Sequence, residues 1–208
     1  MPSDPRITEF VILGTAWVLS IGLHEAGHAY TAHWLGDPTP ELHGRLTLNP
    51  FAHLKPINTA VLLPLFFLAV GGGILGAAST PIDPSRFRKP LRDRLLVAAA
   101  GPAVNLLLAG AFIGIFLLLG ERAPRGSLNH TFLFAMVHLN LVLFLFNMVP
   151  IPPLDGGDVF RYFLGVRGRE VLDGMRQYGI IVAIILLNIP KVAAVYFMPA
   201  YLLEGLVF

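Results

Sequence analysis

Cysteine is absent from this 208-residue sequence, and charged residues are scarce. Without cysteine there is no disulfide and no thiolate metal site, so any bound metal must be held by His, Asp or Glu. Only 13% of the residues are charged, which is about half the share found in a typical soluble domain. Since 55% of the residues are hydrophobic, the composition indicates that the protein is embedded in a lipid bilayer.

The sequence also lacks a strong charge bias and a convincing signal peptide. A formal net charge of +2 is too small to indicate a nucleic-acid partner. The N-terminal stretch has one Arg balanced by Asp4 and Glu9, and no small-residue cleavage site follows the first apolar run. That run continues into the motif HEAGH at 24–28, so we expect it to remain in the mature protein.

Long apolar runs predict an all-α polytopic membrane protein with a single domain over 1–208. A spanning helix needs about 20 mostly apolar residues. One of the apolar segments contains three consecutive glycines, which favours a broken or re-entrant helix. The last has Pro190 and Lys191 near its middle, so it is either one kinked helix or two short helices. The five spanning or re-entrant segments are 7–35, 57–78, 91–120, 131–149 and 178–206.

A polar connector joins the first two segments. Within it, Leu42, Gly44, Leu46 and Leu48 alternate with other residues. This alternation predicts a short strand or β-hairpin after the first helix, whose edge could pair with an extended peptide. The alternative is a loop that simply joins two helices.

The motif HEAGH at 24–28 is the strongest chemical signal in the chain. Residues four apart share one face of a helix, so His24 and His28 can hold one zinc ion while Glu25 acts as the base. The alternative is a chance match, but ionisable groups in the middle of a membrane helix cost about 2.5–3.5 kcal/mol each. We therefore predict a metal site with Zn²⁺ as the cofactor.

Asp155 is the best candidate for a third zinc ligand, because catalytic zinc usually has three ligands from the protein. It follows the apolar segment 131–149 after three prolines, and two glycines come next. The prolines end the helix and the glycines let the chain bend closely around a site. The alternatives are that Asp155 caps the following helix, or that Asp158 competes for the metal.

Two asparagines lie within apolar helices. Asn147 or Asn105 could donate a hydrogen bond to a substrate carbonyl or an oxyanion. Asparagine also bridges membrane helices, and this is the interpretation we favour for Asn105. The remaining histidines are expected to be structural or solvated, although two of them in the connector could line the site; they are His33, His43, His53, His130 and His138.

Charge placement predicts a topology. The stretches 86–94 and 161–176 are strongly basic, whereas the loop 121–125 has two Arg residues and one Glu. By the positive-inside rule the two basic stretches face the cytoplasm and the loop faces outward. A shared zinc site places HEAGH and Asp155 at the same depth, which favours a re-entrant 57–78. We therefore expect the N-terminus outside and the metal site toward the cytoplasmic side.

Three motifs together resemble the site-2 protease family of intramembrane metalloproteases: HEAGH at 24–28, AGPAVN at 100–105 and NMVPIPPLDGG at 147–157. They cover the predicted core helices 7–35, 91–120 and 131–157. The resemblance is to the minimal subgroup without a PDZ or nucleotide-sensing domain, although an acidic residue is expected where Lys55 stands.

The resemblance implies a role for each matching residue. His24, His28 and Asp155 would bind Zn²⁺. Glu25 would act as the base and later donate the proton to the leaving amine, and Asn147 would position the substrate or stabilise the oxyanion. Substrates would be transmembrane proteins or signal-peptide remnants. The compact chain further suggests a prokaryotic plasma membrane as its location.

The residues alone leave two other classes of protein open. In a zinc transporter or metal-sensing membrane protein, Glu25 would be a ligand or a proton relay. A catalytically inactive scaffold would only bind membrane helices, but all the expected site residues are present.

Overall fold

The structure is a computed structural model that describes residues 5–54, 79–119 and 122–208, and these residues form helices, turns and loops. The long helices are α1 (Pro5–Trp34), α5 (Pro90–Leu119), α6 (Leu128–Asn147) and α10 (Pro190–Val207). The shorter elements are α2 (Thr39–Leu42), α3 (Pro50–His53), the 3₁₀ helix η2 (Pro84–Arg86), α7 (Asp155–Phe163), α8 (Val166–Met175) and α9 (Gly179–Leu187).

Three of the described helices, α1, α5 and α6, are long and apolar enough to cross a membrane. Helices α9 and α10 meet at an angle of 87° and make a fourth span if the bent pair crosses as one unit. The all-helical prediction is therefore confirmed for the described residues. The segment predicted at 57–78 lies outside them.

The last predicted segment is two helices rather than one. Ile189 has an extended backbone, and Pro190 is the first residue of α10. Proline suits this first helical position because it has no backbone N–H to lose there, whereas in a continuous helix it would remove a hydrogen bond. Pro190 thus separates α9 from α10.

The strand predicted at 42–48 is wrong. Its first residue ends α2, and the rest of the stretch is turn and loop in the structure. Gly44 has a φ of +67°, and the amide of Arg45 donates to the carbonyl of Pro40 at 2.8 Å. These local hydrogen bonds curl the chain, so the alternating residues do not form one pleated face. The loop alternative describes this stretch correctly.

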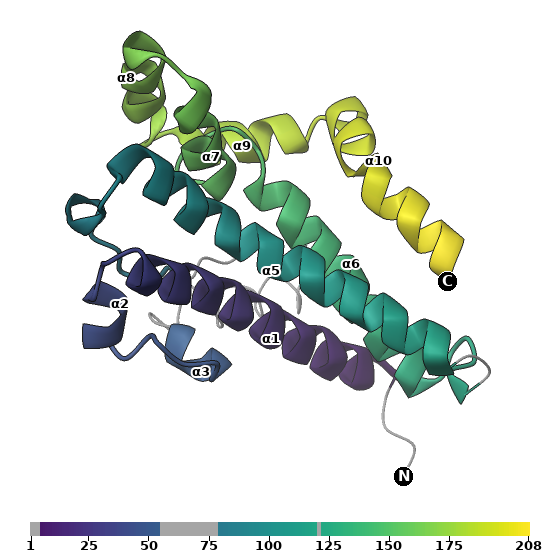
Figure 1. Cartoon of the computed structure of the whole chain (residues 1–208). Coiled ribbons are helices and arrows are strands. Elements are labelled where there is room, and N and C mark those ends of the chain that lie inside the picture. The colour runs from purple at the N-terminus through teal and green to yellow at the C-terminus, as the bar shows by residue number, and fades with distance from the viewer. Residues whose placement is uncertain (1–4, 55–78, 120–121) are drawn as a thin grey trace.

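Helices α1, α5 and α6 pack against one another and form the centre of the molecule (Figure 1). Small side chains lie at their contacts: Ala16, Ala109 and Ala135 are almost fully buried. Small residues let membrane helices approach closely, so that van der Waals contact holds them together. Leucines on the outer face of α5, such as Leu107 and Leu118, are exposed, as expected for a surface covered by lipid.

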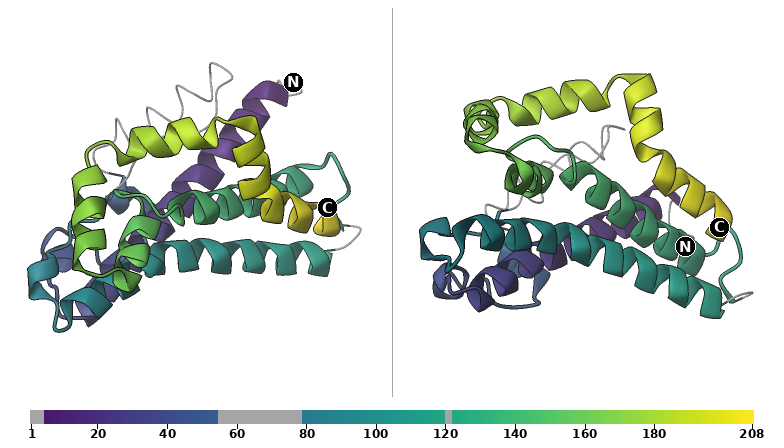
Figure 2. Two further views of the ribbon diagram at one scale, coloured as in Figure 1. Left: turned by 90° about the horizontal axis from the view of Figure 1, so that it is seen from above. Right: turned by 45° about the horizontal axis from the view of Figure 1, so that its top comes forward.

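The two basic stretches meet at one end of this bundle, where α7 and α8 lie near the start of α5 (Figure 2). The guanidinium of Arg94, on α5, lies 2.8 Å from the carboxylate of Asp158, on α7. Arg176 also approaches Asp158, at 3.4 Å. The first of these ion pairs joins α7 to α5, and the second joins α7 to the end of α8.

Candidate metal centre

The motif HEAGH lies on α1, and both of its histidines are buried. His24 is 3% exposed and His28 is 6% exposed. Their rings share one face of the helix, as the four-residue spacing predicts, and their Nε2 atoms are 3.0 Å apart. Two imidazole nitrogens therefore converge on a single point.

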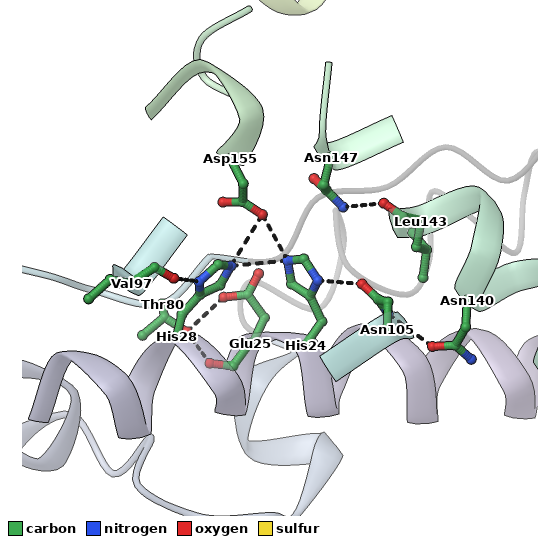
Figure 3. Close-up of polar contacts among 10 residues, drawn as sticks. All are labelled: His24, Glu25, His28, Thr80, Val97, Asn105, Asn140, Leu143, Asn147 and Asp155. Carbon is green, nitrogen blue, oxygen red and sulfur yellow. Dashed lines mark hydrogen bonds and ion pairs between the residues drawn. The ribbon is translucent and has the colours of Figure 1, made fainter. Parts of the chain in front are cut away.

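Asp155 is the first residue of α7. Its Oδ2 atom lies 3.2 Å from Nε2 of His24 and 3.4 Å from Nε2 of His28. Figure 3 shows the carboxylate above the two rings, opposite the helix that carries them. Within the described part of the chain, these three residues are the one group of His, Asp and Glu side chains arranged to hold a metal ion.

Asp158, the competing candidate, is not part of this group. It lies one turn further along α7 and contacts Arg94 and Arg176 instead. Because the glycines after Asp155 have no side chains, the turn can be tight. A Cβ atom on Gly156 would collide with the carbonyl of Met148, which explains why glycine occupies this position.

The chemistry of the donor set fits Zn²⁺. Nδ1 of His28 lies 2.7 Å from the carbonyl oxygen of Val97, which can only accept a hydrogen bond. The Nδ1–H group must therefore donate, so that Nε2 carries the lone pair whenever the ring is neutral. Oδ2 of Asp155 is buried without a hydrogen-bond partner. Two nitrogens and one carboxylate oxygen, with a position left for water or substrate, make the usual ligand set of catalytic zinc.

Gly101, on α5, leaves room for the two imidazoles. A Cβ atom at this position would lie 2.6 Å from Nε2 of His24 and would also collide with Nε2 of His28. Any side chain at this position would therefore enter the space between the two imidazole nitrogens.

Glu25 is buried beside the two histidines. The hydroxyl of Thr80 donates to Oε2 of Glu25 at 2.7 Å and also lies 3.1 Å from the Glu25 backbone carbonyl (Figure 3). Thr80 was missed by sequence reasoning. Nothing in its local pattern marks it, because the contact joins residues 55 positions apart.

The two asparagines lie in different settings. Asn147 is half-buried at the end of α6, where its amide donates to the carbonyl of Leu143 at 3.0 Å. Asn105 is fully buried, and its Oδ1 lies 2.6 Å from Nδ1 of His24. Its Nδ2 donates to Asn140 at 2.9 Å. Asn105 therefore faces the protein interior, which argues against direct contact with a substrate.

The remaining histidines lie outside the metal group. His53 is buried, and its Nε2 lies 2.9 Å from the carbonyl of Thr47. His138 lies 3.0 Å from Glu204 on α10. The others have surface or aromatic partners: His33 contacts Glu41, His43 the carbonyl of Thr39, and His130 the rings of Phe116 and Phe208.

Comparison with known proteins places this centre in a family. The family model "Peptidase family M50" matches residues 120–189. The chain is 37% identical over 180 residues to "Putative zinc metalloprotease YwhC" of Bacillus subtilis, covering 83% of this chain and 78% of that protein. The chain therefore belongs to peptidase family M50, the site-2 protease family, as the three motifs predicted.

Mycobacterial relatives agree with this assignment. "Putative zinc metalloprotease Rip2" of Mycobacterium tuberculosis (strain ATCC 25618 / H37Rv) is 32% identical over 198 residues, covering 95% of this chain and 74% of that protein. The Rip2 protein of Mycolicibacterium smegmatis is 29% identical over 192 residues, covering 92% and 72%. No solved structure matches the chain.

Proposed function

We propose that this protein is an intramembrane zinc metalloprotease that hydrolyses peptide bonds within or near the transmembrane helices of other proteins. One observation carries the proposal. Three ligand atoms of His24, His28 and Asp155 lie within 4.8 Å of one another, with the carboxylate of Glu25 beside them, inside a bundle of helices apolar enough to span a membrane. We propose that residues 1–208 act as a single membrane-embedded domain.

In this proposal His24, His28 and Asp155 hold Zn²⁺. When bound, zinc supplies a Lewis acid that polarises the scissile carbonyl and acidifies water at neutral pH. Glu25 takes the proton from the attacking water and returns it to the leaving amine. The hydroxyl of Thr80 donates a hydrogen bond to Oε2 of Glu25. We therefore assign the proton transfer to the other carboxylate oxygen, Oε1.

Asn147 is proposed to orient the substrate. One hydrogen of its amide donates to the carbonyl of Leu143, and the second is available to a substrate carbonyl or to the oxyanion that forms from it. Such a donor stabilises charge that develops only in the transition state. The half-buried position at the end of α6 allows this contact, whereas the buried Asn105 lacks such access.

The substrate must unwind near the site, because the peptide bonds of an intact helix are shielded by their own hydrogen bonds. Helix-weakening residues close to the cleaved bond should therefore speed cleavage. We propose that the site lies toward the cytoplasmic side of a prokaryotic plasma membrane, with the N-terminus outside. The support is that both basic stretches meet at the end of the bundle that carries α7, of which Asp155 is the first residue.

The test is cleavage of a single-span model protein in proteoliposomes that contain zinc. Wild type is compared with Glu25→Gln, and with Glu170→Gln as a matched control on the exposed face of α8. We expect Glu25→Gln to lower the cleavage rate by about 10²–10⁴-fold while zinc binding persists, and Glu170→Gln to cleave like wild type. Equal cleavage by wild type and Glu25→Gln would refute the assigned base. Zinc flux without cleavage would favour the transporter.

A further inference from the structure

A line of buried polar side chains runs from the metal centre into the contact between α1, α5 and α6. His24, on α1, faces Asn105 on α5, and Asn105 faces Asn140 on α6 (Figure 3). Nδ2 of Asn140 donates to Oγ of Ser20 at 2.8 Å and to the backbone carbonyl of Met136 at 2.7 Å. Asn105, Asn140 and Ser20 are all fully buried.

The last contact fixes the direction of every hydrogen bond in the line. The carbonyl of Met136 can only accept, so Asn140 must turn its Nδ2 group toward it. Its Oδ1 then faces Asn105, which must donate through Nδ2. The Oδ1 of Asn105 is consequently the atom that faces His24, and it can only accept a proton from Nδ1 of that ring.

We propose that Asn105 and Asn140 are positioning residues that hold the proton of His24 on Nδ1 and so present its Nε2 lone pair to the metal. The inference rests on the proposed function. His28 reaches the same state directly, because its Nδ1 faces the carbonyl of Val97. In both rings a backbone carbonyl thus determines that the proton lies on Nδ1. For His28 the contact is direct, and for His24 it runs through two asparagine amides. Contacts of this kind commonly fix the tautomer and the orientation of metal-binding histidines.

A substitution at Ser20 distinguishes this positioning role from simple helix packing. Buried amides also join membrane helices through hydrogen bonds. If helix packing were their only role, the loss of any bond in the line would change zinc affinity to a similar extent. The bond from Asn140 to Ser20 is buried like the others, but it does not set the direction, because Met136 still accepts from Asn140 without it. Ser20→Ala therefore removes a buried bond of the same line and leaves His24 oriented.

The experiment measures zinc affinity of the full chain in detergent by competition with a chelator, together with the unfolding temperature of the metal-free protein. We expect Asn105→Leu to weaken zinc binding by about 10–100-fold. Ser20→Ala should bind zinc like wild type, even though its unfolding temperature falls. Asn105→Asp keeps an acceptor for the His24 proton and should restore affinity to within about tenfold of wild type.

The outcomes separate this inference from the function on which it rests. If Ser20→Ala and Asn105→Leu weaken zinc binding equally, the line of side chains serves only helix packing. Wild-type zinc affinity in Asn105→Leu would overturn this inference but not the proposed function. A wild-type chain that binds no zinc would overturn the proposed function, and the inference with it. If Asn105→Leu does not fold, Asn140→Leu removes the residue that sets the direction and should lower affinity in the same sense, while unchanged affinity would contradict the proposal.

Discussion

The metal centre and the C-terminal helices use buried polar groups in different ways. At the centre, Nδ1 of His24 faces the amide oxygen of Asn105, and Nδ1 of His28 faces the backbone carbonyl of Val97. Along α10, two separate polar contacts reach α6: the hydroxyl of Tyr196 donates to the carbonyl of Leu145 at 2.9 Å, and Glu204 lies 3.0 Å from His138. Apolar side chains also pack there, and Ala200 of α10 shares a buried cluster with Val137 and Leu141 of α6.

The difference teaches which polar contacts matter for chemistry. A displacement of about 1 Å in groups that position a reaction can lower the rate by about 100-fold, whereas an isolated contact between helices contributes only about 0.6 kcal/mol on average in a membrane protein. Changes of similar size in the two regions should therefore have unequal effects on cleavage.

The largest effect is expected for Asp155→Asn. The change keeps the size of the side chain but removes the charge that faces both histidines, so zinc should be lost and cleavage should fall below detection. Asp158→Asn is the matched control, because that carboxylate contacts Arg94 and Arg176 instead. Zinc content by elemental analysis and cleavage in proteoliposomes measure both variants. Retained zinc in Asp155→Asn, or lost zinc in Asp158→Asn, would show that the third ligand is assigned wrongly.

Gly101→Ala is expected to have the next largest effect. The added Cβ atom would meet the Nε2 atoms of both histidines, so one ring must move, and we expect cleavage to fall by about 100-fold, since small displacements at a site can cost this much. Gly110→Ala lies on the same helix, where an added Cβ meets nothing within 4 Å. It should preserve cleavage and raise stability by up to about 1 kcal/mol. The cleavage rate and the unfolding temperature test the pair, and equal cleavage by both would contradict the predicted crowding.

Local patterns predicted much of the fold and also the three residues that we propose as metal ligands. The apolar runs 7–35, 91–120 and 131–149 correspond to α1, α5 and α6, with ends that differ by up to three residues. Helical periodicity alone predicted that His24 and His28 share a face, and the prolines and glycines around Asp155 marked it as a candidate; the structure places all three side chains together. These features are local, so their physical cause is contained in the segment itself.

Other features depend on contacts between distant segments. The partners of Asn105 come from α1 and α6, and Thr80 reaches Glu25 across 55 residues. No periodicity encodes such pairs. The false strand at 42–48 has a different cause: the alternation was real, but Gly44 adopts a left-handed conformation that turns the chain instead of extending it.

Thr80→Val is expected to have a moderate effect on the metal centre. It keeps the shape of the side chain but removes the hydroxyl that donates to Glu25. A hydrogen bond to a charged group contributes about 1.5–3 kcal/mol, so we expect the cleavage rate to fall by about tenfold or more with little change in KM. Thr80→Ser restores the donor and should recover the rate. Steady-state cleavage in detergent measures both, and an unchanged kcat in Thr80→Val would exclude a positioning role.

The smallest effect is expected for Glu204→Gln, in the C-terminal region. The amide oxygen can still accept from His138 when the Nδ1–H group of the ring donates, so the contact between α10 and α6 survives without the charge. We expect the unfolding free energy to fall by less than about 1 kcal/mol, in line with polar contacts between membrane helices, and cleavage to stay near the wild-type rate. Denaturant unfolding and proteoliposome cleavage test this expectation. A loss of cleavage as large as that of Gly101→Ala would mean that α10 controls the geometry of the centre, and the contrast between the two regions would fail.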